Sequence, residues 1–237
     1  IGETSSATVE RVTFDSNRAS HDGSASTSSS AYGGGAFVSN STVDFINTTF
    51  FDNMAIGQND SYGGGIFSEY DAVVNVSHST FGYNDAGMGS TSVSSYGGAL
   101  ARGILTSTTA GDIYIINSIL TGNGSSGSAT SSGQDCYDTV YTHGNNIVSD
   151  TSDCTLSAVG TVTDYTGSTE STSSLADNGG AVETLSVSSG GNAIDGASCL
   201  TVGGESLLVD ARGALRSDGS CDIGAYEAGG TEACEDE

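Results

Sequence analysis

The segment Val74-Asn-Val-Ser-His-Ser-Thr-Phe-Gly-Tyr-Asn84 decides the fold of this chain, because its pattern occurs four times without gaps. The other copies are Ala7–Asn17, Val43–Asn53 and Ile113–Asn123. Each copy begins with alternating apolar and polar residues, has Phe or Leu three positions before its end, and closes on Asn. Alternation with a period of two indicates a β-strand rather than a helix. Four copies in one register indicate a structural repeat.

A glycine motif precedes the second, third and fourth copies. It reads Tyr32-Gly-Gly-Gly-Ala-Phe37, Tyr62-Gly-Gly-Gly-Ile-Phe67 and Tyr96-Gly-Gly-Ala-Leu100. Glycines at a fixed phase are typical of a backbone corner that needs positive φ or close approach of a neighbouring layer. Each repeat is therefore predicted to be strand, corner, strand, corner. The stretches that vary in length, 20–31, 55–61 and 85–95, are predicted to be loops on one side of a stack.

Stacked repeats would place equivalent side chains above one another, about 4.8 Å apart. The expected interior ladder consists of Phe14, Phe50, Phe81 and Leu120, and the expected amide ladder at a turn consists of Asn17, Asn53, Asn84 and Asn123. In the amide ladder each side chain is expected to bond to the next, with a left-handed backbone at each Asn. His78 holds the position of Asn47 and Asn117 and is expected to belong to a ladder as well. We assign both ladders a structural rather than a catalytic role.

Composition alone points toward disorder. The chain of 237 residues has a net charge of −24 and 35 Gly, and Leu, Ile, Val and Phe make up only about a fifth of it. The repeat changes this interpretation, because few apolar residues suffice when they stack on copies of themselves. The absence of Pro agrees with continuous β-stacking, since Pro removes a ladder donor.

The basic residues exclude several function classes. All five are Arg, so the chain has no Lys for a P-loop hydrolase, a protein kinase, a Schiff-base enzyme or a Ser-Lys acylase. The 29 carboxylates oppose binding to nucleic acid and to anionic membranes. The longest apolar stretch, Ile113 to Leu120, is too short to span a membrane.

The glycine corners and the Phe-x-x-Asn endings carry a family resemblance. Over about residues 7 to 123 they resemble the repeats of polymorphic outer-membrane proteins and related bacterial surface proteins. The second half is similar to the choice-of-anchor Q domain in an ordered run of motifs: Asn117 to Asn123, Asp135-Cys136, Gly144 to Val148, Asp153-Cys154, Asp177 to Gly180, Asn192 to Asp195, Cys199, Asp210 to Gly213, Arg216, and Cys221 to Glu227. One departure is Ser217, where that family often has Pro.

The resemblance implies a right-handed parallel β-helix, an all-β solenoid, on or outside a cell surface. Residues 1–130 are then expected to form regular coils. Residues 131–237 are expected to form disulfide-pinned coils and an end cap, continuous with the first part. Members of the choice-of-anchor Q family are secreted and attach to, or are released from, the cell surface by varied C-terminal devices.

Five Cys in an acidic chain without Lys indicate an oxidising, extracellular setting. The order of motifs in the resemblance implies disulfides Cys136–Cys154 and Cys199–Cys221, which leaves Cys234 over. A zinc site is disfavoured because no Cys-x-x-Cys occurs.

A charged cluster in the C-terminal part has two interpretations. It contains Asp195, Asp210, Arg212, Arg216, Asp222 and Glu227. It is either a carboxylate–Arg catalytic cluster or a charge network that closes the open end of the helix, where buried carboxylates need Arg donors. We favour the network, because the resemblance implies that this block recurs as a structural terminus.

Catalysis is disfavoured by spacing and charge. β-Helix lyases need clustered carboxylates for Ca²⁺ and a basic residue, and hydrolases need paired carboxylates. Here Glu10, Asp44, Asp52 and Glu69 do not recur at matching phase. A net charge of −24 would also repel a polyanionic substrate. We expect no cofactor, although Asp and Asn oxygens in turns leave Ca²⁺ open.

The sequence therefore predicts a non-enzymatic extracellular structural protein. We expect it to assemble head to tail with copies of itself into a fibre or surface layer, with Ile1–Ser6 as a docking arm. A first alternative is an adhesin that holds a glycan or host protein with its variable loops and Tyr32, Tyr62, Tyr83 and Tyr96. A second is an enzyme that degrades neutral polysaccharides.

Overall fold

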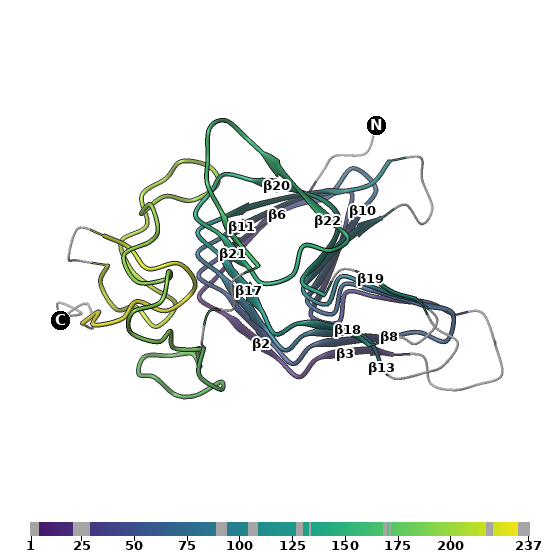
Figure 1. Cartoon of the computed structure of the whole chain (residues 1–237), viewed down its shortest axis with the longest axis horizontal. Coiled ribbons are helices and arrows are strands. Elements are labelled where there is room, and N and C mark those ends of the chain that lie inside the picture. Colours follow the sequence, from purple (N-terminus) through teal and green to yellow (C-terminus); the bar gives the residue numbers. More distant parts are fainter. Residues whose placement is uncertain are drawn as a thin grey trace.

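A computed structural model describes residues 5–20, 29–88, 94–103, 109–126, 130–132, 134–167, 170, 172–216 and 220–231. Within these ranges every regular element is a β-strand, and the paired strands are parallel and form four sheets (Figure 1). The expectation of an all-β chain built from stacked parallel strands is thus confirmed. The remaining turns and loops connect the sheets.

The largest sheet has nine strands and two arms that meet at one long strand. Its first arm contains β1 (Ser5–Glu10), β6 (Ser41–Ile46), β11 (Val73–Ser77), β16 (Asp112–Ile116), β20 (Cys136–Thr142) and β22 (Cys154–Ala158). Its second arm contains β15 (Leu100–Gly103), β10 (Ile66–Glu69) and β5 (Ala36–Ser39). Strand β20 joins the arms because its first residues pair with β15 and its last residues pair with β16.

Three smaller sheets complete each circuit of the chain. The six-stranded sheet contains β2 (Thr13–Asp15), β7 (Thr49–Phe51), β12 (Thr80–Gly82), β17 (Ile119–Thr121), β21 (Ile147–Val148) and β23 (Tyr165–Thr166). One four-stranded sheet contains β3 (Arg18–Ser20), β8 (Met54–Ile56), β13 (Asp85–Met88) and β18 (Gly124–Ser126). The other contains β4 (Ala31–Tyr32), β9 (Asp60–Tyr62), β14 (Ser94–Tyr96) and β19 (Thr130–Ser132).

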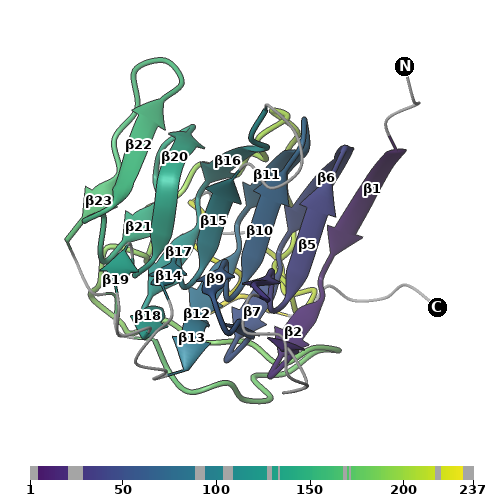
Figure 2. The same cartoon turned by 90° about the vertical axis from the view of Figure 1, so that its right-hand side faces the viewer.

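Successive circuits stack with equivalent residues in register. Thus Phe50 pairs with Phe14 on one side and with Phe81 on the other, and Phe81 pairs with Leu120. Figure 2 shows the strands of successive circuits side by side, from β22 at one end of the stack to β1 at the other. This arrangement is compatible with the β-helix that the resemblance implies.

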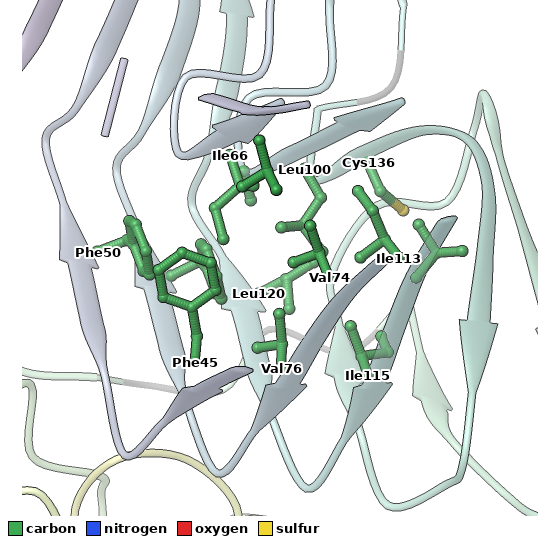
Figure 3. Close-up of a cluster of buried hydrophobic side chains, with 14 of the residues drawn as sticks. Phe45, Phe50, Ile66, Val74, Val76, Leu100, Ile113, Ile115, Leu120 and Cys136 are labelled. Carbon is green, nitrogen blue, oxygen red and sulfur yellow. The ribbon is translucent and has the colours of Figure 1, made fainter. Parts of the chain in front are cut away.

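The core lies between the sheets and is built from the repeated apolar positions. The rings of Phe14 and Phe50 stack with centroids 4.4 Å apart, and those of Phe50 and Phe81 with centroids 4.7 Å apart. Phe50, Phe81 and Leu120 are fully buried. Figure 3 shows side chains of the first arm, such as Val74, in the same cluster as Phe50 and Leu120. Side chains of one type therefore stack in columns through the core.

The glycine motif forms the corner before the second arm. Gly33, Gly63 and Gly97 have φ of +60°, +62° and +62°, which L residues rarely adopt. A Cβ on Gly65 would lie 3.1 Å from the ring of Phe81. The glycines are thus needed both to turn the chain and to admit the Phe column.

The stack narrows after its fourth full circuit. After β21 the chain returns directly to β22, without strands in the two four-stranded sheets. Strands nevertheless continue past residue 130, the expected division, as far as Thr166. Residues 172–216 and 220–231, which we call the lateral segment, contain isolated bridges and turns and lie beside the stack (Figure 1).

Truncating the interior ladder should be costly. Phe81→Ala removes a fully buried ring from the middle of the stack, so we expect the free energy of unfolding to fall by about 3–5 kcal/mol. Urea denaturation measures this. The matched control is Phe37→Ala, because Phe37 is 47% exposed and, among the described aromatic residues, stacks on Phe67 alone, a contact worth about 0.5–1.5 kcal/mol. Equal losses in the two variants would contradict the assignment of Phe81 to the core.

Candidate functional site

The most elaborate polar region is a corner where the lateral segment meets the stack. This corner joins the first arm of the large sheet to the six-stranded sheet. One residue of each circuit turns it with a left-handed backbone, and we call these residues the corner column: Arg11, Asn47, His78, Asn117 and Asn145, with φ between 47° and 55°. Asn and His adopt this conformation more readily than most residues, since their short polar groups can bond locally.

Side chains of the corner column bond to backbone carbonyls of the lateral segment. Arg11 donates to Ala211 and Arg212 (3.3 and 3.1 Å), and Asn47 donates to Val209 (2.8 Å). Nε2 of His78 lies 3.0 Å from the Ser198 carbonyl, and Asn117 donates to the carbonyls of Ser198 and Leu200 (2.6 and 2.9 Å). The column thus forms a docking track along the side of the stack.

Arg216 is the buried centre of the charge network. Its guanidinium donates to Oε2 of Glu227 (2.6 Å), to the carbonyls of Asp222 and Gly224 (3.0 and 2.9 Å) and to Oδ1 of Asn47 (3.1 Å). Because both charged side chains are almost fully buried, each depends on the other for compensation. Arg216 therefore fastens the lateral segment to the second circuit.

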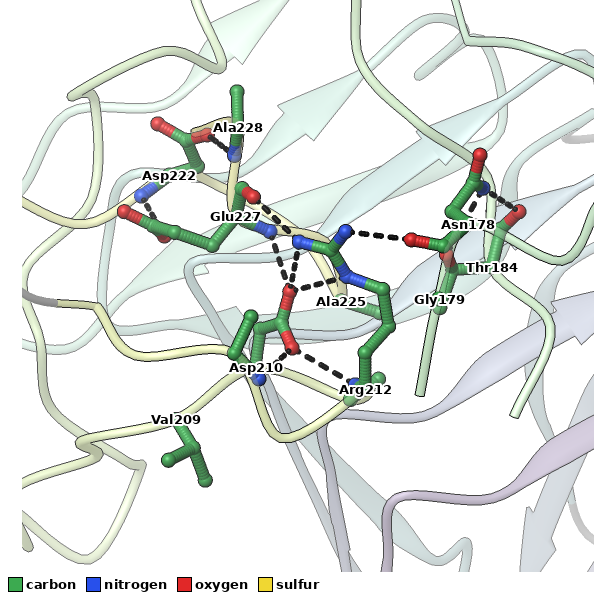
Figure 4. A network of polar contacts seen from close by, with 12 residues as sticks. Asn178, Gly179, Thr184, Val209, Asp210, Arg212, Asp222, Ala225, Glu227 and Ala228 are labelled. Atoms are coloured by element: carbon green, nitrogen blue, oxygen red, sulfur yellow. Dashed lines mark hydrogen bonds and ion pairs between the residues drawn. The ribbon is translucent and has the colours of Figure 1, made fainter. Parts of the chain in front are cut away.

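Arg212 organises the outer half of the network. Figure 4 shows its guanidinium between the carboxylate of Asp210 and the carbonyls of Asn178 and Glu227. It also lies over the ring of Tyr226, 3.9 Å from the centroid. These contacts join distant parts of the lateral segment to one another.

The remaining predicted members of the network bond through backbone amides. The carboxylate of Asp222 accepts the N–H groups of Asp195 (2.8 Å) and Ala228 (2.6 Å). The structure therefore brings all six predicted residues into one region, although Asp195 enters through its backbone N–H.

The expected position of the network at the end of the stack was wrong. The network lies along the side, because the left-handed corner residues offer donors and acceptors at every circuit. Arg212 of the network contacts Arg11 in the first circuit and Arg216 contacts Asn47 in the second, while the neighbouring Ser198 bonds to Asn117 in the fourth. The ends of the stack are instead the edge strands β1 and β2 on one side and β22 and β23 on the other.

Two disulfides pin the second half, and they join the pairs that the resemblance implied. Cys136–Cys154 links β20 to β22, and Cys199–Cys221 closes a loop within the lateral segment. Loops of this size give about 3 kcal/mol each when chain entropy alone is counted. The disulfides are typical of proteins from oxidising compartments. Cys234 lies outside the described residues, as do Ile1 to Thr4 of the expected docking arm.

The amide ladder runs along a second corner. The side-chain Nδ2 of each Asn donates to Oδ1 of the Asn in the next circuit. The distances are 2.9 Å from Asn17 to Asn53, 2.8 Å from Asn53 to Asn84 and 2.9 Å from Asn84 to Asn123. Asn123 in turn donates to the carboxylate of Asp135 (2.9 Å). Burial raises the pKa of that carboxyl, and hydrogen bonds from Ser149 and Asn123 partly offset the effect.

The left-handed backbone lies one residue earlier than expected. It occurs at Ser16, Asp52, Tyr83 and Gly122, with φ between 51° and 66°. These residues turn the chain, so that each following Asn can direct its own N–H and side chain along the stack. The predicted conformation at the ladder residues themselves was therefore wrong.

A second polar ladder escaped the sequence interpretation. The backbone N–H of each member donates to the side-chain oxygen of the next member, over distances of 2.9–3.2 Å. In order along the stack, the members are Thr48, Ser79, Ser118, Asn146 and Asp164, and Asp164 is the final acceptor. Its signal in the sequence is a small polar residue directly after each of Asn47, His78, Asn117 and Asn145, whereas Arg11 is followed by Val12. This ladder also ends in a carboxylate.

His78 belongs to the corner column but differs from its Asn neighbours in being able to titrate. It is fully buried, and burial together with the nearby Arg216 charge lowers its pKa well below 6.5. Carbonyls of Ser198, Asp222 and Leu200 favour the protonated form but do not outweigh burial. The pKa of Glu227 is raised to about 7, mainly by burial. In the folded protein His78 therefore stays uncharged near neutral pH, whereas Glu227, in the adjacent charge network, changes charge there.

The carboxylates considered for catalysis do not form one centre. Glu10 and Asp44 line a common groove, whereas Asp52 lies near Ser16 at the second corner and Glu69 is buried in the second arm. Across the part of the chain that the structure describes, no group of three or more His, Cys, Asp and Glu residues is arranged to hold a metal ion.

The tyrosines considered for adhesion have different environments. Tyr32, Tyr62 and Tyr96 stack on one another, with centroids 5.4 and 4.6 Å apart, and Tyr32 and Tyr62 pack against Phe67. Burial, with a contribution from Asp60, raises the pKa of Tyr62. Tyr83 is 54% exposed. The first three are thus partly structural, and Tyr83 is the most accessible of the four.

No protein-family model, curated protein or solved structure matches this chain. The resemblance to polymorphic outer-membrane proteins and to the choice-of-anchor Q domain therefore rests on the sequence motifs alone. Among the described residues, no helix is long and apolar enough to cross a membrane.

Removing the buried Arg should release the lateral segment. Arg216→Met leaves the Glu227 carboxylate buried without its partner, so we expect a loss of about 3–5 kcal/mol at pH 8. Hydrogen exchange should show reduced protection in the lateral segment before β11 and β12 are affected. The double variant Arg216→Met/Glu227→Gln should regain part of the loss, because no unpaired charge remains. A double variant no more stable than the single one would contradict the pairing.

His78 should make the protein sensitive to acid. The unfolded chain binds a proton at His78 near pH 6.5 and the folded chain does not, so stability falls by up to about 1.4 kcal/mol per pH unit below that value. His78→Asn, which copies Asn47 and Asn117, should reduce the loss between about pH 7.5 and about pH 5 by about 2 kcal/mol. Urea denaturation at both pH values tests this.

The comparison with His78→Asn also separates the effect of Glu227. Because the pKa of Glu227 is raised to about 7, its contribution to stability decreases as the pH rises from its ordinary value of 4.5 toward 7. Glu227 is present in both proteins, so its effect cancels in the difference. Equal acid sensitivity of the two proteins would show that His78 is not the sensor.

Proposed function

We propose that this chain is a right-handed parallel β-helix that serves as a non-enzymatic structural protein outside the cell. We further propose that copies associate head to tail through the ends of the stack. The in-register circuits support the fold, the two disulfides support the oxidising location, and the sequence resemblance supports a surface role.

The assembly proposal rests on one observation, that the strands at the two ends of the stack have an unpaired edge. Strands β1 and β2 pair with other strands on one side only, and so do β22 and β23 at the opposite end. Because all these strands run parallel, β22 of one copy placed beside β1 of the next would extend the large sheet in the same direction. Strand β23 beside β2 would extend the six-stranded sheet in the same way (Figure 2). Unpaired edges of this kind are templates for strand addition.

Apolar exposure at the two ends adds support. Among the described residues, Val12 and Phe37 are exposed at the end formed by β1 and β5, by 37% and 47%. Val159 and Tyr165 are exposed beside β22 and in β23, by 39% and 36%. Association end to end would cover all four side chains.

Charge opposes the same association. With a net charge of −24 and exposed Glu10 and Asp15 in the first circuit, copies repel one another at low ionic strength. Salt at about 0.15 M shortens the range of this repulsion to about 8 Å. We therefore expect association to strengthen as salt is added.

Two proline variants test the head-to-tail arrangement. The N–H of Arg11, directly after β1, donates to the Ile46 carbonyl and so points toward β6. Because N–H groups of successive residues in a strand point to opposite sides, the N–H of Thr8, three residues earlier, points to the open edge. Since Val159 donates its N–H to the Thr142 carbonyl, the N–H of Ala158 likewise points away from β20. Thr8→Pro and Ala158→Pro should each block one edge without breaking a bond within the sheet.

The expected result is specific to a heterologous interface. Wild-type protein should form species that grow with concentration and salt in sedimentation velocity and electron micrographs, whereas each variant alone should stay monomeric. A mixture of the two variants should form dimers and nothing longer, because each retains one functional edge. Monomeric wild-type protein at high concentration and high salt, or growth of either variant alone, would refute the assembly.

A further inference from the structure

A groove of about 360 Å³ lies on the side of the stack, over strands of its first three circuits. Its floor is the outward face of β1, β6 and β11, and its wall is the turn from Thr201 to Glu205 in the lateral segment. The volume falls within the range of small-molecule sites. The groove is therefore large enough for part of an extended ligand.

The floor is a row of polar side chains held in register. Thr8, Asp44 and Asn75 are paired across β1, β6 and β11, and Nδ2 of Asn75 donates to Oδ1 of Asp44 (2.7 Å). This bond fixes both side chains and leaves the second carboxylate oxygen as an acceptor. Ile46 and Val202 add apolar surface to the lining.

The wall is fixed before any ligand arrives. The N–H of Val202 donates to the Ser77 hydroxyl on the floor (2.9 Å). Thr201 and Glu205 bond to each other twice, once between backbones and once from the Glu205 N–H to the Thr201 hydroxyl. The Cys199–Cys221 disulfide pins the chain next to this turn. A preformed wall lowers the entropy cost of binding.

The chemistry of the lining selects the ligand class. Glu10, Asp44 and Glu205 are carboxylates, and no basic side chain is among the lining residues, so an anionic ligand is repelled. Carboxylates and amides arranged in rows bind the hydroxyl groups of sugars. A bare metal ion is disfavoured, since the described acidic residues are not arranged as metal ligands.

The row continues beyond the groove as an aromatic surface. Asn75 pairs with Tyr114, and Tyr114 pairs with Tyr141. The two rings stack with centroids 5.0 Å apart, and both are partly exposed. Aromatic side chains pack against the C–H groups of sugar rings, so this surface suits further residues of a chain that enters the groove.

We propose that this groove binds a neutral oligosaccharide, with Asp44 and Asn75 as the hydrogen-bonding groups at its centre. This assignment goes beyond the structural role and does not depend on assembly, because its central residues Asp44 and Asn75 lie on the inner strands β6 and β11 rather than on the edge strand β1. It also locates glycan binding on a different face from Tyr32, Tyr62 and Tyr96.

Isothermal titration calorimetry with the full chain tests the proposal. The probes are neutral hexasaccharides of glucose, xylose and mannose, with a hexasaccharide of galacturonic acid as the anionic comparison. At least one neutral probe should bind, and Asp44→Ala and Asn75→Ala should each weaken it at least tenfold, a loss of about 1.4 kcal/mol. Val202→Trp, which fills the groove without removing a polar group, should abolish it.

The matched control is Asp52→Ala, a carboxylate at the opposite corner that should leave binding unchanged. Circular dichroism confirms that each variant is folded. The proposal is overturned if no neutral probe binds at millimolar concentration, if the galacturonic acid probe binds as tightly as the neutral ones, or if the folded groove variants bind like wild type. Binding of spermidine without binding of any sugar would identify a cation site instead and would also overturn it.

Discussion

The whole structure depends on one constraint, the in-register stacking of equivalent residues from successive circuits. Strands in a parallel sheet lie about 4.8 Å apart, and the Phe50 and Phe81 rings stack at a matching 4.7 Å. The same register lets Asn53 bond to Asn84 at 2.8 Å. A slip of one residue would turn every Phe of the ladder away from the core and would break the amide ladder as well. Because one register satisfies backbone, rings and amides together, a chain poor in aliphatic residues still folds.

The stacked strands could be predicted from the sequence because their information is local and repeated. Val74 to Asn84 and its copies carry the period, the corner and the ladder within a few residues. The repeat did not reveal which residue turns each corner. Ser16 and Asn17 are both common turn residues, so either could take the left-handed conformation. The decision depends on the neighbouring circuit, where Oδ1 of Asn53 accepts the N–H of Asn17. That bond requires the preceding residue to turn the chain.

The lateral segment could be predicted in part. The resemblance grouped Asp210, Arg212, Arg216 and Glu227, but no spacing in the sequence says what they contact. Arg216 bonds to Asn47, 169 residues earlier, and Asn117 bonds to Ser198, 81 residues later. The segment has no strand period of its own, so its position is set by the corner column. The groove was invisible to sequence reasoning for the same reason, because its floor and wall come from opposite halves of the chain.

The two polar ladders also give the stack a direction. In each ladder, residues of an early circuit donate hydrogen bonds to residues of the next circuit. The last member is a carboxylate, Asp135 or Asp164, whose side chain accepts a hydrogen bond but has no N–H to donate further. Buried amides therefore do not continue across the end formed by β22 and β23. In the proposed head-to-tail assembly a junction would be held by backbone pairing and by the exposed apolar side chains, without the ladders that hold circuits together within one chain. Such a junction would be weaker than any layer inside the stack, so the proposed assembly would depend on concentration and salt while each subunit stayed folded.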